Sequence, residues 1–134
     1  MTVLVIDDED DIRLLAEMGL AASGLNVVVA AGGAEGLALA RTHQPDLIVL
    51  DVMMPEMDGY ATLEALRREP ATAKIPVLML TAKNLAASDE TLRDQGVVDL
   101  VPKPFVPREF VARVLAALSA LEASAKTTRP GRST

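Results

Sequence analysis

The chain has 134 residues and no cysteine, which excludes disulfides, thiolate metal sites and cysteine nucleophiles. Half of its residues are hydrophobic but only 2% are aromatic, so we expect one domain with an aliphatic core. The formal net charge of -6 argues against direct binding of nucleic acid, and the first apolar run, residues 3–6, is too short for a signal peptide or a membrane span. We therefore expect a cytoplasmic protein that does not associate with a membrane.

Apolar runs alternate with helical patterns along the whole chain. Short runs rich in Val, Ile and Leu predict five strands, at residues 3–6, 25–30, 47–50, 75–80 and 97–101. Apolar residues at helical spacing predict a helix after each strand, beginning near Ile12, Ala34, Tyr60, Leu85 and Val111 in turn. The expected ends of these helices are marked by Gly24, Pro45, Pro70, Gly96 and, for the fifth, Leu121.

The predicted strands show no alternation of polar and apolar residues, which indicates a parallel sheet covered by helices on both faces. Because crossovers between parallel strands are right-handed, the predicted fold is an α/β doubly wound open sheet of five parallel strands. We expect the domain to span residues 1–121. Residues 122–134 are polar and contain Pro130 and Gly131, so we predict a disordered C-terminal tail there.

Side chains that can carry chemistry follow these strands, and ligands bind beyond the carboxyl ends of strands in such sheets. The residues at those ends are Asp7, Asp8 and Glu9 after the first strand, Asp51 after the third, Thr81 after the fourth and Lys103 after the fifth. The topology therefore predicts that carboxylates, a hydroxyl and an amine converge at one edge of the sheet.

Carboxylates that lie close together repel one another unless a cation compensates them. Oxygen ligands suit a hard ion, and a site with few carboxylates suits Mg2+, which keeps several of its waters. Lys103 offers a compact positive charge to one phosphate oxygen, and Thr81 offers a hydrogen bond to another. A carboxylate nucleophile, Asp51, beside a metal, a lysine and a hydroxyl is typical of phosphoryl transfer.

Each of these residues also has a plain structural explanation. The acids at residues 7–11 could cap the first helix, and Asp51 could lie in a turn before Pro55. Thr81 could be a helix N-cap, and Lys103 could be a solvated surface residue. Chance does not readily place all of them at one sheet edge, so their joint position favours the chemical interpretation.

Five short segments of the sequence carry distinctive motifs: Val5-Ile6-Asp7-Asp8-Glu9, Leu50-Asp51-Val52-Met53-Met54-Pro55, Met57-Asp58-Gly59, Leu80-Thr81-Ala82 and Lys103-Pro104-Phe105. In their order and spacing, over about residues 2–120, these segments resemble the motifs of the CheY-like receiver domains of bacterial response regulators. The resemblance implies the flavodoxin-like strand order 2-1-3-4-5.

The resemblance also implies which residues bind the phosphoryl group and the metal. Asp51 is expected to accept the group from a phosphohistidine of a sensor histidine kinase or of a histidine phosphotransfer protein, and the domain then switches conformation to signal to a partner. Mg2+ is expected to bind Asp8 and Asp51 directly, Asp7 largely through water, and the backbone carbonyl of Met53.

Other matching positions are expected to support this chemistry. Thr81 and Lys103 are expected to bind phosphoryl oxygens, and Thr81 to shift on phosphorylation. The bond between Lys103 and Pro104 is expected to be cis. Asp58 and Gly59 are expected to shape the loop beside the site.

Two features depart from what the resemblance implies. Leu100 stands where many receivers have Tyr or Phe, so we expect switching to run mainly through Thr81. Only Asp99 and Arg113 match one of the three charged pairs with which some receivers dimerise, because Asp89 and Val98 break the other two. We therefore expect mainly a monomer, with at most a weak dimer through the fourth helix, fifth strand and fifth helix.

Other functions fit these residues less well. A haloacid-dehalogenase type phosphatase needs an acid at Met53, and a flavin carrier needs more aromatic residues than Tyr60, Phe105 and Phe110. We therefore expect no enzyme but a signalling phosphoacceptor that promotes its own phosphorylation and dephosphorylation. A receiver-like interaction module that works without phosphorylation, and a receiver fragment of a longer regulator with an output domain, remain open.

Overall fold

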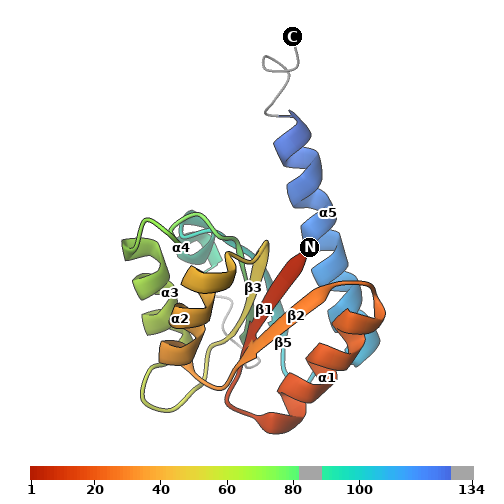
Figure 1. The fold of residues 1–134 in the computed structure, drawn as a ribbon, viewed down its shortest axis with the longest axis horizontal. Helices are drawn as coiled ribbons and strands as arrows, with labels where there is room; N and C mark the ends of the chain where they lie inside the picture. The colour runs from red at the N-terminus through yellow and green to blue at the C-terminus, as the bar shows by residue number, and fades with distance from the viewer. Residues whose placement is uncertain (82–88, 128–134) are drawn as a thin grey trace.

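The structure, a computed structural model, describes residues 1–81 and 89–127 of the chain. Five strands and five helices alternate along that part of the chain (Figure 1). The strands are β1 (Thr2–Ile6), β2 (Asn26–Ala30), β3 (Leu47–Asp51), β4 (Val77–Thr81) and β5 (Val97–Pro102). The helices are α1 (Asp10–Ala22), α2 (Gly33–His43), α3 (Gly59–Arg68), α4 (Asp89–Asp94) and α5 (Pro107–Thr127).

The five strands form one parallel sheet in the order β2-β1-β3-β4-β5. This confirms the doubly wound α/β fold and its flavodoxin-like strand order. From β1 the chain passes first to β2 on one side of the sheet and then to β3 on the other. The strand order therefore switches direction between β1 and β3, and the carboxyl ends of these strands are where such a fold binds its ligand.

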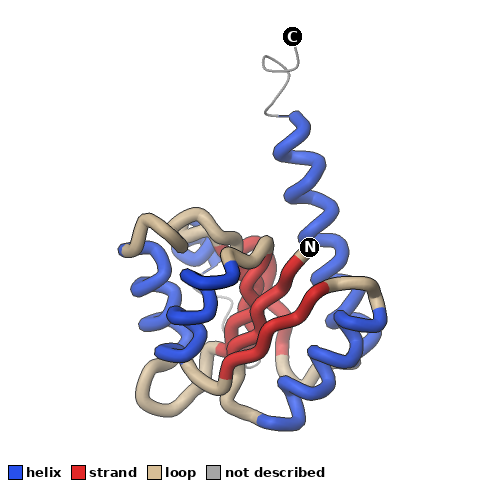
Figure 2. Tube along the Cα trace, in the orientation of Figure 1, coloured by secondary structure: helices blue, strands red, loops and turns tan. Residues whose placement is uncertain are grey.

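The sheet separates two apolar cores because neighbouring strand residues point to opposite faces. Helices α2, α3 and α4 cover one face, and α1 and α5 cover the other (Figures 1 and 2). On the first face Leu4, Ile48 and Met79 of the strands pack with Leu63 and Leu66 of α3. On the second face the strand residues Val5, Val49 and Leu80 pack with Leu20, Phe110 and Val114 of α1 and α5. Burial on both faces explains why the strands lack polar alternation.

Some predicted boundaries differ from the structure. Leu25 and Ile75 lie before β2 and β4, and Pro76, which cannot donate a backbone hydrogen bond, separates Ile75 from the strand. Only α4's buried Leu92 can be compared with the predicted fourth helix, because its other apolar anchor, Leu85, lies outside the described residues.

Helix α5 continues well past its last predicted anchor, Leu121, and projects beyond the sheet (Figure 2). The prediction of a disordered tail is therefore wrong for residues 122–127, which are helical in the structure. Ala, Glu and Lys in this segment are good helix formers. The domain boundary at residue 121 stays a prediction. Within residues 1–81 and 89–127, neither α5 nor another helix is long and apolar enough to cross a membrane.

Candidate functional site

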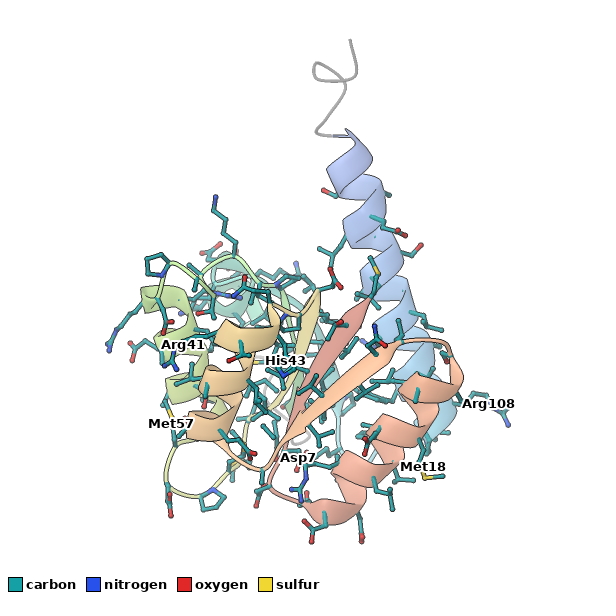
Figure 3. All side chains as sticks on the ribbon, viewed as in Figure 1. Asp7, Met18, Arg41, His43, Met57 and Arg108 are labelled. Carbon is teal, nitrogen blue, oxygen red and sulfur yellow. The ribbon has the colours of Figure 1, made fainter. Side chains whose placement is uncertain are left out.

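The carboxyl ends of four strands bring the predicted residues to one edge of the sheet. Asp7 directly follows β1, Asp51 is the last residue of β3, and Thr81 is the last residue of β4. Because β3 lies between β1 and β4, Asp51 is at the middle of this edge. Lys103 directly follows β5, and its backbone N–H donates to the carbonyl of Thr81 at 2.7 Å. Figure 3 shows Asp7 at this edge, beside the start of α1.

Asp7, Asp8 and Asp51 form a cluster of three carboxylates. One oxygen of each lies within 4.8 Å of the corresponding oxygens of the other two. Asp7 and Asp51 are buried, with 0% and 1% of their surface exposed, and Asp8 is more exposed than either. The structure therefore brings together three of the acids that the sequence placed after the first and third strands.

Backbone amides hold one oxygen of each buried carboxylate. The N–H of Glu9 donates to Asp7 Oδ1 at 2.9 Å, and the N–H of Met53 donates to Asp51 Oδ1 at 3.3 Å. The second oxygens, Asp7 Oδ2 and Asp51 Oδ2, accept no hydrogen bond of good geometry from the described residues. Because an unsatisfied buried oxygen is costly, these two atoms are the ones most in need of a cation.

Lys103 supplies a positive charge to this cluster. Its Nζ lies 3.0 Å from Asp7 Oδ2 and 3.2 Å from Asp51 Oδ2, which are ion-pair distances even though neither approach has good hydrogen-bond geometry. The same ammonium group donates a hydrogen bond to Glu9 Oε1 at 2.8 Å. Three carboxylates therefore surround one lysine, whose side chain is only 18% exposed.

The charges at the site do not balance. Burial, and then the charge of Asp7, raises the pKa of Asp51 from its ordinary 3.8 to about 6, although Lys103 and the backbone of Met53 act to lower it. Burial alone would lower the pKa of Lys103, but its contacts with Glu9 and Asp7 and the charge of Asp51 raise that pKa above its ordinary value. The lysine is therefore fully charged at neutral pH and still does not compensate the carboxylates around it.

A hard divalent cation fits this arrangement. The donor atoms are all oxygens, with no histidine or cysteine among the clustered groups, and such donors suit Mg2+ better than Zn2+. The two buried oxygens without a hydrogen-bond partner give the ion a place to bind, and the more exposed Asp8 leaves room for metal-bound water.

The loop after Asp51 is held close to the end of β3. A Cβ on Gly59 would lie 2.4 Å from the carbonyl oxygen of Asp51 and 2.7 Å from Cα of Val52, so this position requires glycine. The N–H of Gly59 donates to the carbonyl of Val52 at 2.8 Å, and Asp58 caps α3 by accepting from the N–H of Ala61 at 2.9 Å. Asp58 and Gly59 therefore shape the loop beside the site, as expected.

Two further expectations concern residues near Asp51 and Lys103. The peptide bond between Lys103 and Pro104 is cis, which confirms the prediction. The side chain of Met53 is 69% exposed, so it takes no part in the core. The roles expected for the Met53 carbonyl and for the Thr81 hydroxyl stay predictions.

Comparison with known proteins agrees with this geometry. Residues 3–115 match the family of response regulator receiver domains. The chain belongs to this family. It is a receiver domain, the part of a two-component response regulator that accepts a phosphoryl group.

Two regulators and one solved structure illustrate the relationship. The receiver domain is 43% identical over 123 residues to the alkaline phosphatase synthesis transcriptional regulatory protein PhoP of Bacillus subtilis, covering 92% of this chain and 50% of that protein. It is 44% identical over 116 residues to the DNA-binding dual master transcriptional regulator RpaA of Synechocystis, covering 87% of this chain and 48% of that protein. The chain thus spans about half the length of the curated relatives it matches.

The solved structure is the chemotaxis protein CheY4 of Vibrio cholerae. It superimposes with a TM-score of 0.78 at 31% identity and covers 86% of this chain and 96% of its own. An almost complete match to such a chain confirms the CheY-like fold of this receiver domain.

Asp99 and Arg113, the charged pair on the face expected to form at most a weak dimer, bind each other within one chain. Arg113 of α5 donates from Nε to Asp99 Oδ2 at 2.9 Å and from Nη2 to Asp99 Oδ1 at 2.5 Å. The hydrogen bond to Asp99 raises the pKa of Arg113. Leu100 is half-buried and packs against the core on the α2–α3–α4 face, which agrees with a packing role for it.

The sequence indicated no separate role for Glu9. The structure places its carboxylate on Lys103, which stands 94 residues later in the chain. The signal in the sequence was an acid directly after the predicted pair Asp7 and Asp8, but its position is equally typical of a helix cap.

Proposed function

We propose that Asp51 of this receiver domain accepts a phosphoryl group from a phosphohistidine of a sensor histidine kinase or of a histidine phosphotransfer protein. The observation that carries the proposal is the position of Asp51 at the centre of the sheet edge, with Oδ1 held by a backbone amide and Oδ2 facing Lys103. Since its pKa is raised only to about 6, Asp51 is mainly the carboxylate at neutral pH, which is the nucleophilic form.

The transfer is a displacement at phosphorus. A carboxylate oxygen of Asp51 forms a bond to phosphorus while the bond between phosphorus and the histidine nitrogen breaks, and the electron pair of that bond stays on the imidazole. Lys103 lies close enough to Asp51 to neutralise charge on one phosphoryl oxygen, and we assign the binding of another to the hydroxyl of Thr81, the last residue of the neighbouring strand β4. Attack of water on the same phosphorus later restores Asp51 and releases phosphate, so no separate substrate is turned over.

We further propose that Mg2+ binds at the acidic cluster, directly to Asp8 and Asp51, largely through water to Asp7, and to the backbone carbonyl of Met53. The bound ion supplies positive charge that offsets the negative charge on the transferred group. The two buried oxygens without hydrogen-bond partners, one from Asp7 and one from Asp51, support this assignment.

The first prediction is that acetyl phosphate with Mg2+ phosphorylates Asp51. The intact mass should rise by one phosphoryl group in the wild type and in Asp11→Asn, which removes an exposed acid of α1. It should not rise in Asp51→Asn, or in the wild type with a chelator in place of Mg2+. A wild-type mass that stays constant under conditions that label another receiver domain would rule out the proposal and favour an interaction module that works without phosphorylation.

The length of the relatives favours a second proposal, about output. Because the chain spans about half of proteins that are named as transcriptional regulators, we propose that residues 1–121 act as the regulatory domain of a longer regulator whose output lies elsewhere. An antibody against this domain, used on a cell extract, should detect a band of about twice the mass of this chain. A band at the mass of this chain alone would indicate a receiver domain that acts by itself.

A further inference from the structure

Glu9 is a charged residue at the site that takes no part in the proposed phosphoryl transfer or metal binding. It occupies the N-cap position of α1, where an acidic side chain often accepts a hydrogen bond from its own helix, but it makes no such bond. Its carboxylate instead accepts a hydrogen bond from Lys103 Nζ at 2.8 Å, the shortest of the three contacts of this ammonium group with carboxylates. The side chain of Glu9 is 60% exposed.

Carboxylates already surround the ammonium group of Lys103. Oxygens of Asp7, Glu9 and Asp51 lie between 2.8 and 3.2 Å from Nζ, and of these three approaches only that of Glu9 is a hydrogen bond of good geometry. The hydrogen bond to Glu9 therefore orients the ammonium group in the resting state. To turn toward a phosphoryl oxygen, the lysine must give up or weaken one of these contacts.

The three carboxylates differ in how easily they can leave. Asp7 is completely buried, and its other oxygen is held by the backbone N–H of Glu9. Asp51 is buried and carries the incoming group itself. The carboxylate of Glu9 can turn into solvent at little cost because it is mostly exposed, while the backbone bond from Glu9 to Asp7 stays intact.

We propose that Glu9 is a displaceable counter-ion of Lys103, a positioning residue that holds the lysine in the resting state and leaves when a phosphoryl group arrives. This inference rests on the proposed function of Asp51. Glu9 and a phosphoryl oxygen compete for the ammonium group of Lys103, so Glu9 weakens the affinity of the site for the phosphoryl group and slows its arrival. The contact with Glu9 is also the largest of those that raise the pKa of Lys103, which agrees with a strong resting ion pair.

The test uses beryllofluoride, a mimic of the phosphoryl group, titrated in the presence of Mg2+. Glu9→Gln removes the charge and keeps the size, whereas Glu9→Asp keeps the charge but is one methylene too short to keep the contact with Lys103. Both variants should bind beryllofluoride about two- to tenfold more tightly than the wild type, the range expected for losing a partly exposed ionic hydrogen bond, and should be phosphorylated faster by acetyl phosphate. Asp11→Asn, which removes an equal charge from α1 without touching the ion pairs of Lys103, should bind as the wild type does.

The variants separate this inference from its alternatives. If Glu9→Gln and Asp11→Asn tighten binding equally while Glu9→Asp does not, the effect is general charge repulsion and the counter-ion role is wrong. Unchanged or weaker binding in both Glu9 variants overturns it as well. A wild type that neither binds beryllofluoride nor becomes phosphorylated would instead contradict the proposed function of Asp51.

Discussion

At the scale of single residues, the charge on Asp51 destabilises the metal-free fold. Its pKa is about 6 in the folded protein and close to the ordinary 3.8 in the unfolded chain. Between these values the folded state holds more protons than the unfolded state, so stability falls as pH rises through this window and the full cost remains above it. A shift of this size corresponds to at most about 3 kcal/mol.

The resulting prediction concerns Asp51→Asn, which removes this charge. With a chelator present and at about pH 7.5, the variant should be more stable than the wild type by about 1–3 kcal/mol, and the difference should vanish below about pH 4. Urea unfolding at a series of pH values measures it, with the exposed Asp11→Asn as the control for loss of one negative charge. An Asn variant that is less stable than the wild type at about pH 7.5 would show that the pairing of Asp51 with Lys103 outweighs its burial.

At the scale of secondary structure elements, one side chain of α3 ties the end of α4 to the fold. Arg67 of α3 donates from Nε to the carbonyl of Gln95, just after α4, at 2.5 Å, and from Nη1 to the carbonyls of Thr72 and Ala73 at 3.3 and 3.2 Å. Burial lowers the pKa of this guanidinium, and its Nη2 has no hydrogen-bond partner among the described residues. Among residues 89–94 the buried apolar side chain is Leu92, and we expect the hydrogen bond from Arg67 to add to this contact in holding the helix.

Arg67→Met tests this contribution because methionine keeps the apolar stem and loses all three hydrogen bonds. Leaving backbone carbonyls unpaired should destabilise the fold by about 1–3 kcal/mol, and the unpaired Nη2 of the wild type places the result in the lower half of that range. Hydrogen exchange should increase in residues 89–96 more than in β1 and β3. Arg68→Met, at the exposed neighbouring position, should leave both measurements near the wild type. Equal loss of protection throughout the sheet would mean that Arg67 stabilises the whole fold and not α4 in particular.

At the scale of the whole molecule, the sequence predicted the sheet and its active edge for a physical reason. A strand such as β3 is buried at every position, and burial on both faces allows only apolar residues until the strand ends at Asp51. Because the strands are parallel, polar residues that directly follow such runs meet at one edge of the sheet. The position of Asp7, Thr81 and Lys103 at this edge could therefore be predicted from the sequence.

The contacts that escaped prediction join residues far apart in the sequence without any periodic pattern. The carboxylate of Glu9 reaches Lys103, and Arg67 reaches the carbonyl of Gln95, through side-chain directions that apolar spacing does not encode. The length of α5 was missed for another reason. The apolar stripe ends at Leu121, but residues with high helix propensity continue the helix to Thr127. A prediction based on the spacing of apolar residues does not detect a helical segment that has no apolar stripe.

The last prediction is that the unphosphorylated protein is a monomer. Asp99 and Arg113, which match one charged pair of the receivers that dimerise, are joined to each other within one chain by two hydrogen bonds. Arg113 also donates to the carbonyl of Leu100 at 3.1 Å. A dimer that used this pair between chains would have to break these bonds first, and exposed pairs contribute only about 0–1 kcal/mol each. Sedimentation velocity at micromolar concentration should therefore show a single monomer boundary for the wild type and for Arg113→Ala. A tight wild-type dimer that Arg113→Ala abolishes would mean that Arg113 exchanges its internal partner for one on a second chain.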